Sequence, residues 1–157
     1  MRRDHKGVLT LQVDINEIMN LIAKEQQLYD SLISLVDEEM KCARDGNMSA
    51  LMDVLRRKQA VICDQEVLQD LWLELAALLG VSSSRETVEF WDALALKLDQ
   101  KGYGQVVESI GKIRERAAKI LEKEHEVQKE LETRLADLRS DLLRLNDGMR
   151  AFRAYMR

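Results

Sequence analysis

The sequence predicts an all-α fold in which long amphipathic helices pack lengthwise as an elongated, coiled-coil-like bundle. The chain of 157 residues contains no proline and only seven glycines, so few residues interrupt a helix. Its hydrophobic fraction of 46% and charged fraction of 33% allow a buried core and argue against a disordered tail. Apolar residues recur at alternating spacings of three and four along three long segments, as in packed helices. The length fits a single domain over 1–157.

The first two long segments predict an antiparallel helical hairpin over 14–79, with arms at 14–45 and 48–79. Between the arms, Gly46 suits a left-handed C-terminal cap and Asn47 can cap the next helix. A connection this short places the arms side by side. The stripe of the first arm consists of Met19, Ile22, Gln26, Tyr29, Ile33, Val36, Met40 and Ala43. The stripe of the second arm consists of Leu51, Val54, Lys58, Val61, Gln65, Leu68, Trp72, Leu75 and Leu79.

A short helix and a third long helix are expected to follow the hairpin. Ser83 with Glu86 three residues later reads as a capping box that opens the short helix, 84–98. Gly102-Tyr103-Gly104 is expected to close it. The long helix over 105–145 should pack along the hairpin, and Asn146-Asp147-Gly148 offers a break before a tail, 146–157. The stripe of the long helix consists of Val107, Ile110, Arg114, Ala117, Leu121, Glu124, Gln128, Leu131, Leu135, Leu138, Leu142 and Leu145.

Charge and the sequence of the N-terminus exclude several classes of protein. The net charge is −4 with both signs interspersed, which argues against a nucleic-acid binder. We find neither a signal peptide nor an apolar run long enough to cross a membrane, so we expect a soluble cytoplasmic protein without membrane insertion. Cys42 and Cys63 should be free thiols, because the hairpin would hold them roughly 18 Å apart.

No motif in the sequence predicts catalysis. A phosphate-binding glycine loop, a nucleophile elbow, a zincin helix and a Cys-x-x-Cys motif are all missing, so we expect no enzyme, no cofactor and no metal. Glu122 and His125 form one Glu-x-x-His motif, but di-iron bundles need two copies and the only other histidine is His5. A solvated charged turn is therefore favoured for this motif. A di-metal four-helix enzyme is the least favoured of the candidate functions.

The C-terminal part of the chain carries the features that indicate binding to another protein. The densest apolar stripe consists of Leu131, Leu135, Leu138, Leu142 and Leu145, and such a stripe can take an amphipathic partner helix. Alternatively, the short helix or a second copy of the chain covers this surface, so homo-oligomerisation stays open. The tail residues Phe152 and Tyr155 lie among arginines. They suit either a docking peptide or a last helical turn that packs on the bundle.

The chain resembles the FlgN family of flagellar type III export chaperones over about residues 14–148. The resemblance is carried by residues 32–80, an apolar-acidic helix, an Asp-Gly-Asn turn, a Leu-x-x-x-Leu entry, Lys58 and a leucine-rich run that ends in Gly80: LISLVDEEMKCARDGNMSALMDVLRRKQAVICDQEVLQDLWLELAALLG. A short middle helix and a long last helix follow in the family's order.

The resemblance implies a cytoplasmic chaperone that binds the helix-prone C-terminal segments of hook-filament junction proteins. Such a chaperone prevents premature assembly and delivers these hook-associated proteins to the type III export apparatus. It needs no nucleotide, metal or covalent chemistry. The client would lie on the stripe from Leu131 to Leu145, and Phe152 and Tyr155 would dock to the export gate. The alternative function is a non-catalytic structural or adaptor bundle that acts by helix–helix interaction.

Overall fold

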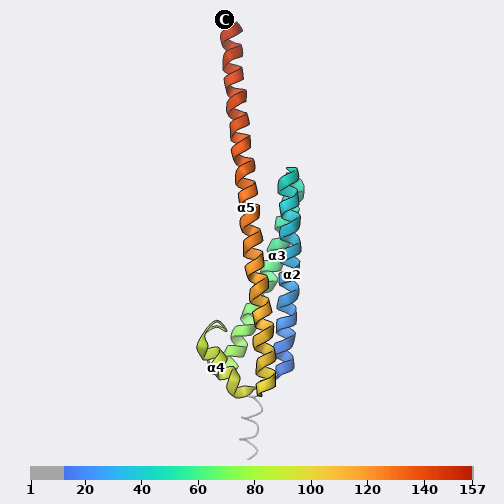
Figure 1. Ribbon diagram of the computed structural model, residues 1–157, viewed down its shortest axis with the longest axis vertical. Helices are drawn as coiled ribbons and strands as arrows, with labels where there is room; N and C mark the ends of the chain where they lie inside the picture. Colours follow the sequence, from blue (N-terminus) through green and yellow to red (C-terminus); the bar gives the residue numbers. More distant parts are fainter. Residues whose placement is uncertain (1–12, 157) are drawn as a thin grey trace, which may run out of the picture.

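The computed structural model describes residues 13–156 and confirms the all-α prediction, with no strand in that range. Its helices are α2 (Ile15–Asp45), α3 (Met48–Leu78), α4 (Val88–Lys97) and α5 (Gln100–Met156). They form an elongated bundle in which α5 runs far beyond the other helices (Figure 1). The long axis of the bundle follows the long axes of the helices, as the sequence predicts.

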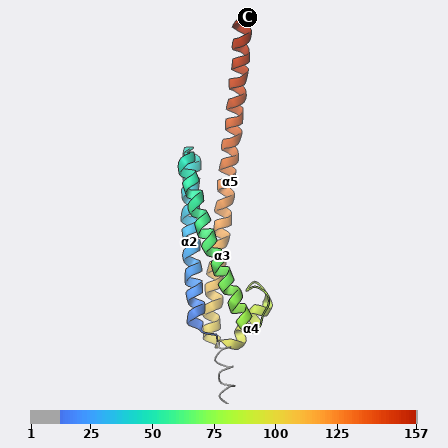
Figure 2. The same ribbon diagram turned by 180° about the vertical axis from the view of Figure 1, so that it is seen from behind.

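The α2–α3 hairpin turns at the residues that the sequence indicated. Gly46 adopts a left-handed conformation with φ 68° and ψ 22°, and its amide donates to the carbonyl of Ala43. The side chain of Asn47 then accepts a hydrogen bond of 3.1 Å from the amide of Ala50, which caps α3. From this turn α3 runs back beside α2 and diverges toward α4 at the base (Figure 2). Both predicted caps are therefore confirmed.

The predicted start of the short helix is wrong by a few residues. Helix α4 begins at Val88, and Thr87 is its cap because Thr87 Oγ1 accepts a bond of 3.4 Å from the amide of Phe90. Ser83 does not cap a helix; its hydroxyl lies 3.0 Å from Thr87 Oγ1. Glu86 belongs to the preceding turn, where its amide donates to Ser84 Oγ. Thr87 is also a good N-cap residue, and the helix starts after Thr87 instead of after Ser83.

The predicted joint at Gly102-Tyr103-Gly104 is also wrong, because α5 already begins at Gln100. The chain turns two residues earlier, and the Asp99 carboxylate accepts a bond of 2.6 Å from the amide of Gly102. Gly102 is buried within the first turns of α5. A Cβ at this position would lie 2.7 Å from Cδ1 of Ile15, so the glycine allows α2 and α5 to approach closely.

Helix α5 continues through Asn146-Asp147-Gly148 to Met156, so the predicted break and separate tail are wrong as far as the chain is described. At helical rise its 57 residues span roughly 85 Å. Its lower part packs mainly on α2, and its C-terminal part projects past the hairpin turn (Figures 1 and 2). Gly148 is tolerated here because one glycine inside a helix costs only about 1 kcal/mol.

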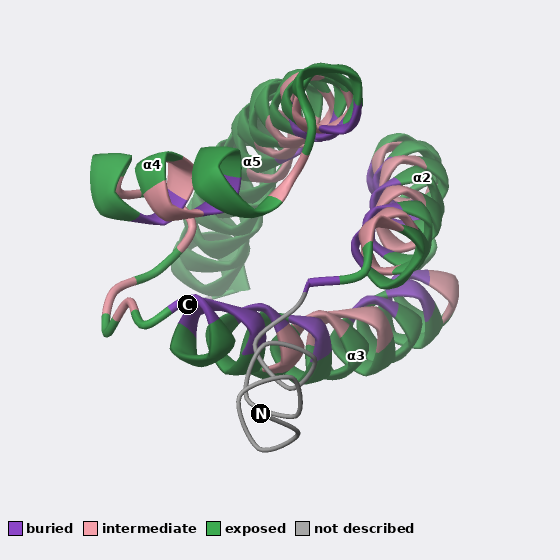
Figure 3. Cartoon of the chain, turned by 90° about the horizontal axis from the view of Figure 1, so that it is seen from below, coloured by how far each residue is buried: buried purple, intermediate pink, exposed green. Residues whose placement is uncertain are grey.

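The core lies at the base of the molecule, where the buried faces of α2, α3 and α5 point toward one another (Figure 3). Phe90 and Leu94 of α4 are fully buried there, and Trp72 meets Phe90 edge-on with ring centroids 6.3 Å apart. Aromatic pairs in this geometry add to the free energy of apolar burial. The same cluster contains Ile18, Ile22, Tyr29, Leu32, Leu75, Ala76, Val106, Ile110 and Ile113.

The predicted stripe of the long helix is correct at the buried Ile110 but displaced by one residue at several other positions of its lower half. The structure buries Val106 and Ile113, whereas Val107 and Leu121 of the predicted stripe are 44% and 71% exposed. Val106 and Val107 are adjacent and both apolar, so the period of the sequence fits burial of either one.

Two further findings concern the membrane and the cysteines. Among residues 13–156, no helix combines the length and apolar character that crossing a membrane requires. Cys42 is half-buried and Cys63 is exposed, and both are free thiols as predicted.

Candidate functional site on the projecting part of α5

The hairpin ends where Arg134 of α5 reaches it. The guanidinium of Arg134 donates to the carbonyl oxygen of Arg44, and its Nη1 lies beside Gly46. Beyond this point, residues 135–156 of α5, called here the overhang, have no other helix beside them in Figures 1 and 2. The overhang is roughly 33 Å long at helical rise.

One face of the overhang is a continuous line of large apolar side chains, called here the exposed seam. These residues are between 47% and 68% exposed, although a helix facing only water has no reason to align such side chains. A shallow groove runs along it beside Gly148. The exposed seam consists of Leu135, Leu138, Leu142, Leu145, Met149, Phe152 and Met156.

The exposed seam follows a heptad pattern without interruption. From Leu131 to Met156 its members alternate spacings of four and three, which is the a/d pattern of a coiled coil. Where the hairpin ends, the buried Val127, the half-buried Leu131 and the exposed Leu135 are separated by two successive spacings of four. The heptad phase therefore changes where the hairpin ends. The sequence-based stripe extended the upper phase down the helix, which explains the one-residue error at Val107 and Leu121.

The structure brings the predicted client-binding residues into one line, with an added member. Leu131 is half-buried beside the hairpin, whereas Leu135, Leu138, Leu142 and Leu145 are exposed. Phe152, predicted as part of a separate tail, lies on this same line and is 65% exposed. Tyr155 is 87% exposed on the neighbouring face. The sequence missed the continuity between the two sets because Asn146-Asp147-Gly148 suggested a break.

The hairpin is joined to α5 by a buried polar contact that lies below the overhang. Lys58 Nζ of α3 donates to Glu39 of α2 at 2.7 Å and to Glu124 of α5 at 2.5 Å. Burial opposes the charge of Lys58, but the two carboxylates outweigh it and raise the pKa of this lysine. Three helices thus meet at one ammonium group. The sequence predicted Lys58 in the seam of its helix but missed both partners.

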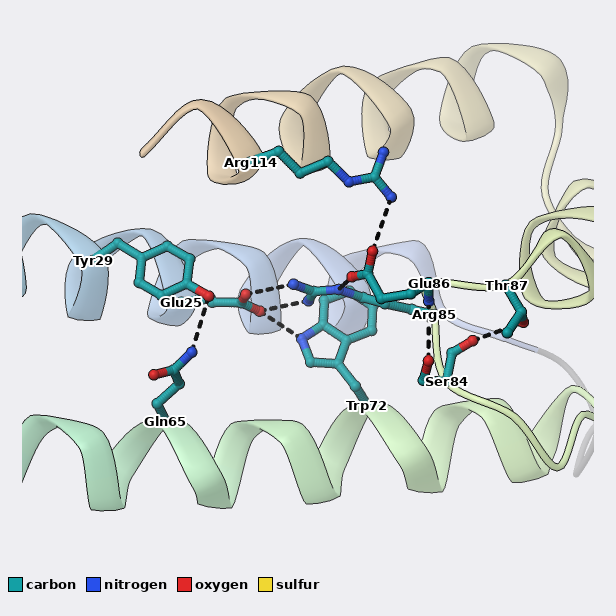
Figure 4. A network of polar contacts seen from close by, with 9 residues as sticks. All are labelled: Glu25, Tyr29, Gln65, Trp72, Ser84, Arg85, Glu86, Thr87 and Arg114. Atoms are coloured by element: carbon teal, nitrogen blue, oxygen red, sulfur yellow. Dashed lines mark hydrogen bonds and ion pairs between the residues drawn. The ribbon is translucent and has the colours of Figure 1, made fainter. Parts of the chain in front are cut away.

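A second polar network fixes the loop before α4 (Figure 4). Arg85 donates two bonds of 2.6 Å to the buried carboxylate of Glu25, and Trp72 Nε1 donates to the same carboxylate at 2.8 Å. The Arg85 guanidinium also lies 4.7 Å from the centre of the Trp72 ring. Nearby, burial and the Glu25 carboxylate raise the pKa of Tyr29, whose hydroxyl accepts a bond of 3.0 Å from Gln65.

This network ties the loop before α4 to α2 and α3 at the base of the bundle. Every polar side-chain atom of residues 13–156 that is buried has a hydrogen-bond partner. Glu25 and Arg85 were not singled out from the sequence, because a glutamate within an apolar period interrupts the pattern on which the prediction depends.

Glu122 and His125 do not belong to a cluster of ligands. His125 and Glu122 are exposed on the middle of α5. Across the part of the chain that the structure describes, no group of three or more histidine, cysteine, aspartate or glutamate side chains could hold a metal ion. His5 lies outside the described residues.

The exposed seam is an aligned apolar surface with no other described helix of the same chain beside it. Comparison with protein-family models, with characterised proteins and with solved structures finds no match to this chain.

Proposed function

We propose that the chain is an export chaperone of the FlgN type, which binds the helix-prone C-terminal segments of flagellar hook-filament junction proteins. The observation that carries this proposal is the exposed seam on the overhang. An amphipathic client segment would lay its own residues at positions i, i+3, i+4 and i+7 against it. The chaperone would act in the cytoplasm, prevent premature assembly of the client and deliver it to the type III export apparatus.

The geometry of the overhang suits reversible capture of an unfolded segment. Burial of apolar side chains on both helices contributes favourable binding free energy. The conformational entropy that the client segment loses when it becomes ordered offsets part of it. Because the overhang is a single helix open on most sides, it covers less of the client than a closed groove would. Moderate affinity and release at the export apparatus follow from that balance.

Calorimetry with the C-terminal peptide of a hook-filament junction protein from the same organism tests the proposal. The central pair Leu138→Ala/Leu142→Ala should lose about 2 kcal/mol or more of binding free energy, since central anchors dominate such contacts. The matched control is Leu143→Ala. Leu143 is 65% exposed, similar to the seam residues, but lies on another face of α5.

The outcomes separate the site from the function. Normal binding by the Leu138→Ala/Leu142→Ala variant would move the client site away from the overhang, whereas no binding by the unaltered protein would favour an adaptor bundle without an export role. Tyr155→Ala, just outside the exposed seam, should leave peptide affinity unchanged and lower client export if the C-terminal end docks to the export gate.

A further inference from the structure

We propose that two copies of this chain pair through their overhangs, antiparallel and in one defined register, when no client is bound. The second copy would cover the exposed seam, and a client would have to displace it. The inference goes beyond the proposed function and does not depend on it, because it rests on the heptad pattern and the flanking charges.

Antiparallel pairing matches the members of the exposed seam from Leu135 to Phe152 with one another. When two overhangs cross between Leu143 and Arg144, Leu142 meets Leu145 of the second copy, and Leu138 meets its Met149. Leu135 likewise meets Phe152, so that each layer combines an a position with a d position. Because the arrangement is two-fold symmetric, each pairing occurs twice and the contact closes on itself as a dimer.

The charges that flank the seam favour this register. The e positions of the heptads are Glu132, Arg139, Asn146 and Arg153. In the register described, Glu132 lies beside Arg153 of the second copy, and Arg139 lies beside Asn146. The pairing therefore gains two Glu132–Arg153 ion pairs and places no like charges together on this side. On the other side, Arg134 meets Tyr155 and Asp141 meets Gly148.

Other arrangements place arginines against one another. A shift of one heptad in one direction sets Arg139 against Arg139 of the second copy, and a shift in the other direction sets Arg139 against Arg153. Parallel pairing sets Arg134 against Arg139, once on each side. Since flanking charges determine orientation and register in coiled coils, these repulsions disfavour the alternatives.

The packing of α5 within one chain shows that the same face accepts a helix. Below the hairpin turn this face packs on α2 through Val106, Ile110, Ile113 and Val127. The overhang of the second copy would continue the path of α2 upward and would end near Gly46. The change of heptad phase at Leu131 and Leu135 also marks the overhang as a packing segment distinct from the lower half of α5.

Sedimentation equilibrium of the full chain without client tests the pairing. We expect a dimer, with roughly tenfold weaker association for Glu132→Arg and for Arg153→Glu. The double variant Glu132→Arg/Arg153→Glu should restore association, because the pairs are re-formed with exchanged charges. The matched control Arg139→Glu should change association little in the proposed register and should strengthen it in a parallel dimer.

Disulfide formation then measures the orientation. In a Cys42→Ser/Cys63→Ser background, a chain with Leu138→Cys should cross-link to a chain with Met149→Cys and not to itself. Self-linking of each variant would show a parallel dimer and overturn the proposal, as would a monomer at all concentrations. Neither result bears on client binding, which the calorimetric experiment measures separately.

Discussion

Lys58 of α3 and Glu124 of α5 are joined by a contact of 2.5 Å, although 66 residues separate them in the sequence. Glu39 of α2 binds the same ammonium, and its side chain is only 6% exposed. The three residues hold the third long helix in register against the hairpin. Everything above them on α5 depends on this alignment, including the point at which the overhang leaves the hairpin.

Removing the ammonium should therefore destabilise the bundle. Lys58→Met leaves Glu39 buried without a cation, and we expect a loss of about 3 kcal/mol in urea unfolding, the low end for a broken buried pair because Glu124 keeps some solvent. Lys58→Met/Glu39→Leu should recover most of the loss. Lys123→Met, which breaks the exposed pair with Asp37, should have little effect. A Lys58→Met variant as stable as the unaltered protein would refute this account.

Two glycines in the same stretch of α5 should respond in opposite directions to alanine. A Cβ at Gly102 would lie 2.7 Å from Ile15 Cδ1 and from the capping carboxylate of Asp99, so Gly102→Ala should cost about 1–3 kcal/mol. At Gly104 a Cβ meets nothing within 4 Å, and Gly104→Ala should stabilise the helix by about 0.5–1 kcal/mol. Thermal unfolding of the two variants gives the comparison, and equal effects would contradict the close approach of α2.

Lys58 and Tyr29 should make the unfolding free energy fall at alkaline pH. At lower pH the contribution of these two residues should not vary. Folding raises the pKa of Lys58 above 10.5 and that of Tyr29 above 10.0, so the folded state holds both protons more tightly than the unfolded chain. Their contribution is complete below pH 10 and is lost as the pH rises through the folded values. Unfolding free energies measured from pH 8 upward should decline above about pH 10. Tyr29→Phe should flatten that decline, and an unchanged slope would exclude Tyr29 as a cause.

Removal of the overhang should leave the rest of the molecule folded. A chain that ends after Arg134 loses residues with no other described helix of the same chain beside them. At concentrations too low for pairing of two copies, we expect its unfolding free energy to change by no more than about 0.5 kcal/mol. A chain that ends after Lys119 also loses Glu124 and the buried Val127, and should be clearly less stable. Circular dichroism during heating compares them. A large loss of stability in the chain that ends after Arg134 would show that the overhang supports the bundle.

The hairpin was predictable because its signals are local. Gly46 and Asn47 determine the turn by their own backbone and side-chain chemistry, and the apolar period of each arm requires no knowledge of the partner helix. The seam of α3 was also correct at Lys58 and Trp72, both of which are buried.

The errors arise where tertiary contacts decide between local alternatives. Glu25 and Glu39 of α2 are buried because Arg85 and Lys58 meet them, and those partners lie 60 and 19 residues away. A buried lysine in a predicted seam was the available signal, since it requires carboxylates nearby. Gly102 was read as a break because its role, the close approach of Ile15, is visible only once α2 and α5 are placed together.

The length of the α2–α3 hairpin determines how much of α5 stays available to a partner. The face that packs on α2 and the exposed seam lie on one side of a single helix, and only the position of Gly46 divides them. Adding seven residues to each arm would raise the turn by roughly 10 Å and bury one heptad of the seam. Removing seven residues from each arm would expose one more heptad of α5. Variation in hairpin length among related chains would thus set the length of helix that each one can bind, without any change in α5 itself.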